Sequence, residues 1–333
     1  MPARCDYLLR FQPLFRRYLW GGRRLAAMLG KPLGEGDDYA ESWEIVDHGA
    51  DQSVVRAGPL AGQALGELVR NHRRELLGEV QRAGSVSARS NESFPLLFKF
   101  LDCNRTLSVQ VHPNDQQAAE LHPPDLGKTE AWVVLHAEPG SKIYSGLKEG
   151  VTREALAAAI DAGRVEECLH SFDAKAGDCV FIPAGTVHAL GAGLVIAEIQ
   201  QASDTTFRLF DWNRVDATGK PRPLHVDQSL AVIDYATGPV APQMPRRIAP
   251  GVERLVECDK FVLQRREAAA PTTVGGDGRF HLLAVIEGQV QATSDPLGSP
   301  LARGMTALVP AAAGPIELKP QGRAVVLDIF LPG

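Results

Sequence analysis

GDCVFIPAGTVH (177–188) is the stretch of sequence that decides the expected fold. Gly177 precedes a short run of β-branched and aromatic residues. Pro183 ends that run, because proline lacks the N–H that a central strand must donate. A second glycine-containing turn follows and leads to His188. This order predicts a turn, a strand that stops at a proline, and a histidine on the far side of the next turn.

Other short apolar runs also lie between glycines and prolines. The 32 glycines and 23 prolines are spread along the 333 residues, which is typical of a strand-rich fold with many turns. In TLSVQVH (106–112) the apolar residues 107, 109 and 111 are predicted to face one way, and Ser108, Gln110 and His112 the other. Further strands are expected at 93–102, 130–137, 178–184 and 194–201.

Two stretches have helical spacing instead, residues 60–82 and 152–170. The second begins with Thr152 as a candidate N-cap and breaks at Gly163, which predicts a helical hairpin or two short helices. Helices that are added to a sheet protein, and do not alternate with every strand, disfavour a doubly wound parallel fold.

The chain is expected to contain two domains. Residues 237–252 are rich in proline and glycine and are predicted to form a connector. The apolar runs 280–292, 307–313 and 324–332 follow it and predict a smaller second β-domain. We therefore expect a mainly β chain, with a first domain at 1–240 that carries the two helical stretches and a second domain at 241–333.

A weak internal repeat links the two expected domains. Gly177 to Pro183 and Gly304 to Pro310 share a G-x5-P spacing. The fifth residue after the proline is His188 in the first copy and Pro315, which cannot bind a metal, in the second. Either the chain holds two related β-units of which one carries chemistry, or the match is a coincidence among glycine- and proline-rich turns.

Charge and composition exclude several classes of protein. A net charge of -5 argues against a general nucleic-acid binder, which needs a surplus of cations to displace counterions from phosphates. No apolar run approaches the ~20 residues that span a bilayer, and arginines interrupt the N-terminal apolar stretch, so neither a membrane span nor a secretory signal is expected. The five scattered cysteines form no CxxC pair, which fits a reducing cytoplasm.

Four polar side chains could surround a divalent cation. Gln110 and His112 are expected on one face of a strand, Glu130 near the start of another, beside Lys128, and His188 beyond a turn. Nitrogen and oxygen ligands of this kind suit Zn²⁺. Taken singly, each histidine is more often a hydrogen-bonded core residue than a ligand, so the prediction depends on the set.

The spacing G-x5-P-x-G-x2-H resembles the second motif of the cupin jelly-roll barrel. The first cupin motif reads H-x-H, and Gln110-Val111-His112 stands in its place here. Ala192 replaces the asparagine that often ends the second motif. These departures weaken the likeness to a generic oxygenase cupin.

Longer collinear motifs make the chain resemble the type I phosphomannose isomerase family in its short bacterial form. The resemblance implies a cupin jelly-roll barrel with added helices and a smaller, degenerate cupin-like β-domain, and it fades after about residue 240. The matching motifs are WGGRRL (20–25), ESWEIVDH (41–48), FPLLFKFLDCNRTLSVQVHPND (94–115), GKTEAW (127–132), FIPAGTVHALGAG (181–193), EIQQASDTTFRLFDWNR (198–214) and DATGKPRPLH (216–225).

The resemblance also implies an activity, a cofactor and a site. The expected reaction interconverts mannose 6-phosphate and fructose 6-phosphate through an enediolate, with one Zn²⁺ per chain. The implied ligands are Gln110, His112, Glu130 and His188. The implied active-site residues are Arg208 for turnover, Lys128, Glu198, Asp204 and Glu41 in the sugar pocket, and Ser108 and Lys99 at the phosphate end.

Several alternatives stay open in the sequence. The general base could be Glu198, Lys128 or a metal-bound water. A carboxylate or a hydroxide is preferred, because Lys128 would need a lowered pKa. The substrate could be a different phosphorylated hexose, since pocket shape decides the sugar. A non-catalytic sugar-binding cupin and an Fe(II) cupin dioxygenase are the alternatives from other classes. The expected partner is a small sugar phosphate, and the oligomeric state is open, a monomer included.

Overall fold

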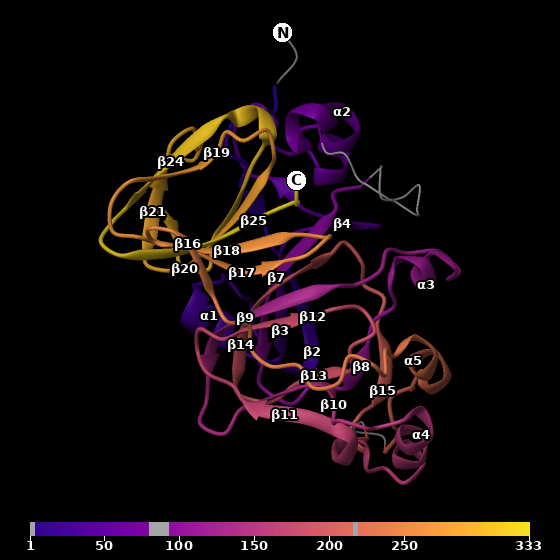
Figure 1. The fold of residues 1–333 in the computed structure, drawn as a ribbon. Helices are drawn as coiled ribbons and strands as arrows, with labels where there is room; N and C mark the ends of the chain where they lie inside the picture. The colour runs from indigo at the N-terminus through magenta and orange to yellow at the C-terminus, as the bar shows by residue number, and fades with distance from the viewer. Residues whose placement is uncertain (1–3, 80–92, 216–218) are drawn as a thin grey trace.

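Four β-sheets form the body of the protein (Figure 1). The computed structural model describes residues 4–79, 93–215 and 219–333. Strands predominate in the described residues, which confirms the mainly β fold. The helices are α1 (Arg24–Leu29), α2 (Leu65–Leu77), α3 (Asp115–Ala119), α4 (Arg153–Asp161) and α5 (Val226–Val232), with 3-10 turns η2 (Val165–Cys168) and η3 (Ala311–Ala313).

Two sheets make a first sandwich. One has the strand order β11-β10-β13-β8-β15 and the other the order β12-β9-β14-β7-β3-β2. Their bounds are β2 (Leu14–Gly22), β3 (Tyr39–Ile45), β7 (Leu96–Cys103), β8 (Val109–Val111), β9 (Glu130–Ala137), β10 (Lys142–Leu147), β11 (Leu169–Asp173), β12 (Cys179–Ile182), β13 (His188–Leu190), β14 (Leu194–Gln201) and β15 (Phe207–Phe210).

Two further sheets make a second sandwich, with orders β16-β17-β18-β25-β20-β23 and β19-β24-β21-β22. Their bounds are β16 (Arg246–Ala249), β17 (Val252–Glu257), β18 (Val262–Ala268), β19 (Thr272–Gly275), β20 (His281–Glu287), β21 (Gln289–Ala292), β22 (Leu301–Ala302), β23 (Thr306–Val309), β24 (Pro315–Pro320) and β25 (Ala324–Phe330). Small two-stranded pairs join β1 (Phe11–Gln12) to β6 (Val54–Val55) and β4 (Asp47–His48) to β5 (Asp51–Gln52).

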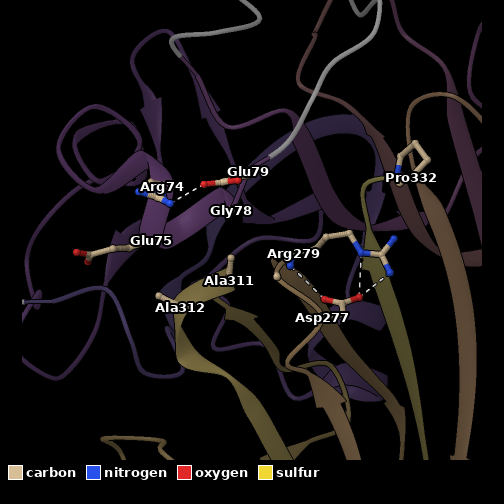
Figure 2. A pocket seen from close by; sticks show the side chains of 11 residues that line it. Arg74, Glu75, Gly78, Glu79, Asp277, Arg279, Ala311, Ala312 and Pro332 are labelled. Carbon is tan, nitrogen blue, oxygen red and sulfur yellow. Dashed lines mark hydrogen bonds and ion pairs between the residues drawn. The ribbon is translucent and has the colours of Figure 1, made fainter.

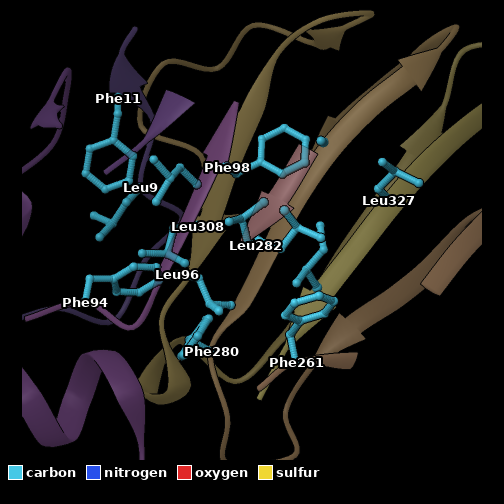
Figure 3. Packing of buried hydrophobic residues seen from close by; sticks show 14 of the residues in the cluster. Leu9, Phe11, Phe94, Leu96, Phe98, Phe261, Phe280, Leu282, Leu308 and Leu327 are labelled. Carbon is cyan, nitrogen blue, oxygen red and sulfur yellow. The ribbon is translucent and has the colours of Figure 1, made fainter. Parts of the chain in front are cut away.

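The two six-stranded sheets pack back to back. Figure 3 shows Leu96 and Phe98 of β7 in one apolar cluster with Leu282 of β20 and Leu327 of β25. Each such side chain contributes ~1.5–3 kcal/mol when it is fully buried, so this cluster is a major part of the core. Leu9, near the N-terminus, joins it and pairs with Leu308 of the second sandwich.

Successive side chains of β9 point alternately to this cluster and to the interior of the first sandwich. Ala131 and Val133 face the back-to-back cluster, whereas Trp132 and Val134 pack inside the sandwich. Glu130 is two residues from Trp132 and therefore points into the sandwich. The alternating pattern of β9 thus explains why the Glu130 carboxylate lies inside the first sandwich.

The two sandwiches share one strand order. β12-β9-β14-β7 in the first corresponds to β23-β20-β25-β18 in the second, and β11-β10-β13-β8 corresponds to β22-β21-β24-β19. Gly177 and Gly304 begin equivalent turns with φ of 95° and 84°, a region that favours glycine. The shared order supports two related β-units over coincidence as the explanation of the repeated G-x5-P spacing.

The helical predictions are confirmed in the described residues. Thr152 caps α4 and accepts a hydrogen bond from the Ala155 backbone N–H at 3.2 Å. After Gly163 the chain forms η2, so two short helices are present, but the last two residues of the predicted stretch, Leu169 and His170, belong to strand β11. Helix α2 occupies the middle of the stretch predicted at 60–82, whose last three residues lie outside the described residues.

Two local predictions were wrong. The expected connector 237–252 contains β16, which pairs with β17 and extends the second sandwich. The predicted alternation of 106–112 fails at Leu107, which packs with Trp20 and Trp132, whereas Val109 and Val111 pack in another cluster beyond the five-stranded sheet. Strand β8 begins only at Val109, so period-2 alternation does not extend back to Leu107.

Candidate metal centre

Three side chains from three segments converge inside the first sandwich. Glu130 begins β9, His188 begins β13 and His112 directly follows β8. All three are buried, and their candidate ligand atoms lie within 4.8 Å of one another. Glu130 Oε2 lies 3.5 Å from His112 Nε2, and Glu130 Oε1 lies 3.4 Å from His188 Nε2. Two imidazoles and a carboxylate at this separation can share one cation.

Backbone carbonyls orient both imidazoles. The Nδ1–H of His112 donates to Thr205 O at 3.0 Å, and that of His188 donates to Thr186 O at 2.9 Å. Each Nε2 then carries the ring's lone pair and lies on the side of the ring near the Glu130 carboxylate. His188 Nε2 is buried and has no hydrogen-bond partner among the described residues. An orphaned, inward-facing imidazole nitrogen fits a metal ligand.

The protonation states also fit a metal site. Burial lowers the pKa of His188 to about 3. Burial, with the nearby Lys128 ammonium, lowers the pKa of His112 well below its usual range. Both rings are therefore neutral near pH 7, which is the form that binds a metal. Lys128 Nζ lies 2.7 Å from Glu130 Oε2 and 3.0 Å from His112 Nε2, so these ligand atoms already gather around a positive charge.

Gln110 and Arg208 extend the site along one row of the five-stranded sheet. His188 of β13 pairs with Gln110 of β8, and Gln110 pairs with Arg208 of β15. Directly opposite residues of neighbouring strands point to the same face, so the three side chains are neighbours. Gln110 is half-buried and lies directly opposite His188 of the His112–Glu130–His188 group. Arg208 Nη1 donates to Pro223 O at 2.9 Å, and its buried Nε has no partner among the described residues.

Two of the three predicted sugar-pocket carboxylates, Glu198 and Glu41, lie beside Lys99. Its Nζ lies 3.4 Å from Glu198 Oε1 and 3.6 Å from Glu41 Oε2. Burial disfavours the charged form of Lys99, but Glu198 and Glu41 outweigh burial and raise its pKa. Lys128 Nζ lies 3.7 Å from Glu198 Oε1, so the two lysines share this carboxylate. Burial raises the pKa of Glu198 above its usual value. Ion pairs therefore run without a break from Lys99 through Glu198 and Lys128 to Glu130.

Ser108 and Asp204 make no hydrogen bond or ion pair with the other predicted site residues in the part of the chain that the structure describes. Ser108 is buried just before β8, and Asp204 is exposed on the loop between β14 and β15. Asp204 still acts on Lys99, whose pKa it helps to raise. The structure therefore brings three of the four metal-ligand candidates, His112, Glu130 and His188, close together, and it shows no contact between the phosphate-end candidates Ser108 and Lys99.

The sequence reasoning missed a guanidinium cluster beside Arg208. Arg214 and Arg222 both donate to Asp211, which is buried. Burial and the charge of Arg222 lower the pKa of Arg208. Arg222 lies within the DATGKPRPLH motif, and a positive charge in a motif that the resemblance links to a sugar phosphate was the signal that could have found it.

The sequence reasoning also missed Thr205 and Asp125. Thr205 contributes a backbone carbonyl, which every residue type carries, so composition gives no signal for it. Asp125 acts through hydrogen bonds to the loop that holds Thr205. Only the folded loop brings these groups to His112.

A hollow of about 990 Å³ lies elsewhere, between α2 and the second sandwich (Figure 2). Its charged side chains are engaged with one another or with backbone: Arg74 pairs with Glu79, Arg279 with Asp277, and Glu75 accepts the Cys5 N–H.

The second sandwich lacks the metal set at the equivalent positions. Glu130 pairs with Ile182 one residue before Pro183, and His281 pairs with Val309 one residue before Pro310. Their strands, β9 and β20, are equivalent in the sheets, so His281 replaces the carboxylate. Strands β13 and β24 are likewise equivalent, and the first residue is His188 in β13 and Pro315 in β24. Among the described residues, His112, Glu130 and His188 are the one cluster of this kind.

Comparison with known proteins agrees with this geometry. The family model "Phosphomannose isomerase type I, catalytic domain" matches residues 8–128. The mannose-6-phosphate isomerase ManA of Bacillus subtilis is 34% identical over 326 residues, which cover 96% of this chain and 98% of that protein. The chain belongs to the type I phosphomannose isomerase family.

Further mannose-6-phosphate isomerases are similar to this chain over most of their length. The mannose-6-phosphate isomerase of Streptococcus mutans is 36% identical, over 85% of this chain and 87% of its own. The crystal structure of the mannose 6-phosphate isomerase from Bacillus subtilis superposes with a TM-score of 0.86 at 28% identity, and covers 97% of this chain and 99% of that one. The cupin jelly-roll architecture expected for the family is therefore consistent with the two sandwiches.

No helix in the described residues combines the length and the apolar character that a bilayer crossing requires.

Proposed function

We propose that the chain is a zinc-dependent isomerase that interconverts mannose 6-phosphate and fructose 6-phosphate. The proposal is carried by one observation: His112, Glu130 and His188 converge in a buried site, in line with Gln110 and Arg208. Membership in the type I phosphomannose isomerase family supports the same reaction.

His112, Glu130, His188 and Gln110 are the residues that would hold one Zn²⁺ per chain. The neutral rings and the buried carboxylate supply two nitrogens and an anionic oxygen, and Gln110 adds an amide oxygen. When bound, the cation supplies Lewis-acid stabilisation of the charge that builds on the sugar oxygens as the C–H bond next to the carbonyl breaks.

Arg208 is proposed to stabilise the enediolate. Its guanidinium is permanently charged, and it lies in the same cross-strand row as Gln110. An electrostatic partner of this kind typically lowers a barrier by ~3–4 kcal/mol.

Glu198 is our choice for the base that carries the proton between the two carbons. Glu198 Oε1 is buried and has no hydrogen-bond partner among the described residues. Its raised pKa brings it closer to the range of an effective general base. Lys128 instead donates to Glu130, so its ammonium is better placed to hold charge than to accept a proton.

Ser108 and Lys99 are proposed at the phosphate end, with Glu41 and Asp204 lining the sugar pocket. A phosphate near Lys99 would compete with Glu41 and Glu198 for the ammonium. Binding energy from a group remote from the reacting carbons orients them at the metal, so free mannose should be a poor substrate. Equal efficiency with mannose and mannose 6-phosphate would contradict this assignment.

A coupled assay for fructose 6-phosphate, with mannose 6-phosphate as the substrate, tests the reaction. We expect turnover with this substrate and much less with other phosphorylated hexoses. A strong preference for a different hexose phosphate would move the assignment to that sugar. Bound iron together with oxygen consumption would instead indicate a cupin dioxygenase.

We place the catalytic domain at residues 1–240 and a smaller domain at 241–333, with the reaction in the cytoplasm. All five cysteines are unpaired, which suits a reducing compartment. The small sugar phosphate is the proposed partner.

A further inference from the structure

The two imidazoles of the metal centre are oriented in different ways. His188 Nδ1 donates to Thr186 O, only two residues earlier in the chain. His112 Nδ1 donates to Thr205 O, 93 positions away, on the loop between β14 and β15. The orientation of His112 therefore depends on a distant loop, whereas that of His188 is set locally.

Asp125 holds that loop in place. Its Oδ2 accepts hydrogen bonds from the Thr205 hydroxyl at 2.6 Å and from the Ser203 hydroxyl at 2.9 Å. Thr205 N also donates to Ser203 Oγ at 3.2 Å, which ties the loop to itself. Two hydroxyls thus bind one carboxylate, and hydrogen bonds to an ionised acceptor are roughly twice as strong as neutral ones.

Asp125 is itself fixed. Its side chain is 13% exposed, its Oδ1 accepts the Leu126 N–H at 2.8 Å and lies 3.5 Å from His48 Nε2, and its own N–H donates to Ala118 O at 3.0 Å. The carboxylate is therefore a rigid anchor for the loop and not a mobile surface charge.

We propose that Asp125 is a positioning residue for the metal centre. Through the Thr205 hydroxyl it fixes the Thr205 carbonyl, which sets the tautomer and ring angle of His112. This inference rests on the proposed zinc site. Removing a group that orients a metal ligand through hydrogen bonds typically weakens metal binding by about 10–100-fold.

Thr205→Val and Thr205→Ser test the proposal. Valine keeps the shape and the backbone carbonyl but loses the hydroxyl, whereas serine keeps the hydroxyl. We expect Thr205→Val to weaken Zn²⁺ binding by about 10-fold or more, measured by competition with a chromophoric chelator. We expect Thr205→Ser to stay within about twofold of the parent chain, since the hydrogen bond to Asp125 remains.

The visible spectrum of the Co²⁺-loaded chain separates positioning from general destabilisation. Co²⁺ absorption reports ligand geometry, so Thr205→Val should shift the spectrum, and Thr205→Ser should not. Thr306→Val is the matched control, because it breaks a threonine–carboxylate hydrogen bond of 3.2 Å to Glu44 away from the site. The control should leave both Zn²⁺ affinity and the Co²⁺ spectrum unchanged.

The outcomes separate this inference from the proposed function. Zn²⁺ affinity of Thr205→Val within twofold of the parent chain, with an unchanged Co²⁺ spectrum, would overturn the positioning role alone. A parent chain that binds no Zn²⁺ would overturn the proposed function and this inference together. If Thr205→Val does not fold, Asp125→Asn takes its place, because it keeps the side-chain volume and removes the charge. This variant should show the same loss of Zn²⁺ affinity.

Discussion

Glu130 and His281 begin equivalent strands of the two sandwiches, yet within the described residues only Glu130 of the two lies in a cluster of metal-ligand candidates. His281 instead contacts Asp328 at 2.7 Å through Nδ1 and Asp277 at 3.1 Å through Nε2. The same place in the fold is thus a candidate metal centre in one sandwich and an internally paired ion cluster in the other.

This difference predicts one Zn²⁺ per chain. Glu130→Gln removes the only anionic ligand of the proposed set, so we expect metal content to fall to near zero after dialysis. His281→Gln changes the equivalent position and should keep one equivalent of zinc. Elemental analysis of both variants checks this, and loss of zinc from His281→Gln would contradict it.

Arg208→Ala should lower kcat by roughly a hundredfold, because it removes a charge from the proposed enediolate site. The thermal melting curve should stay close to that of the parent chain, since Arg208 is only half-buried. Arg303→Ala is the matched control: its Nε is also buried without a partner among the described residues, but it lies in the second sandwich. Near-normal kcat for Arg208→Ala would remove its catalytic role.

Lys99→Met should destabilise the fold. It would leave Glu41 and Glu198 buried without their shared cation, and breaking a buried ion pair from one side costs roughly 3–5 kcal/mol. The double variant Lys99→Met, Glu198→Gln should recover part of the loss, because it removes one of the two stranded charges. Urea unfolding measures both, and a Lys99→Met chain as stable as the parent would show that these carboxylates do not depend on Lys99.

The second sandwich should become less stable as pH rises. Burial disfavours protonated His281, but Asp328 and Asp277 outweigh burial and raise its pKa above 6.5. A raised folded-state pKa gives stability that is full below 6.5 and is lost as pH rises through the folded value, by ~1.4 kcal/mol for each unit of elevation. The pKa of Asp328 is lowered, so it stays charged throughout this window.

Thermal melting between pH 6 and pH 9 checks the sign of this effect. The parent Tm should fall more steeply with rising pH than the Tm of His281→Gln, which cannot titrate there. Parallel curves for the two chains would contradict the role of His281.

Local chemistry made much of the fold predictable. Strands β9 and β14 have the bounds expected from their apolar runs, and Thr152 caps α4 as expected. The failures have physical causes. Leu107 precedes β8 and packs in a different cluster, and the edge strand β16 lies in a segment whose prolines and glycines indicated a connector.

The site was predictable to a similar extent. Gln110, His112, Glu130 and His188 stand out because nitrogen and oxygen ligands at motif spacing indicate a cation. The structure gathers His112, Glu130 and His188 in one cluster and places Gln110 opposite His188 on the neighbouring strand. Thr205 and Asp125 do not stand out, because a backbone carbonyl and a loop carboxylate have meaning only once the β14–β15 loop is in place. The pairing of Lys99 with two carboxylates likewise required the register of β3, β7 and β14.

The most direct measurement follows zinc content and mannose 6-phosphate isomerisation together through chelation and metal return. We predict that turnover disappears as one equivalent of zinc per chain is removed and returns in proportion as one equivalent is restored. Full turnover in a chain stripped of metal would contradict the account.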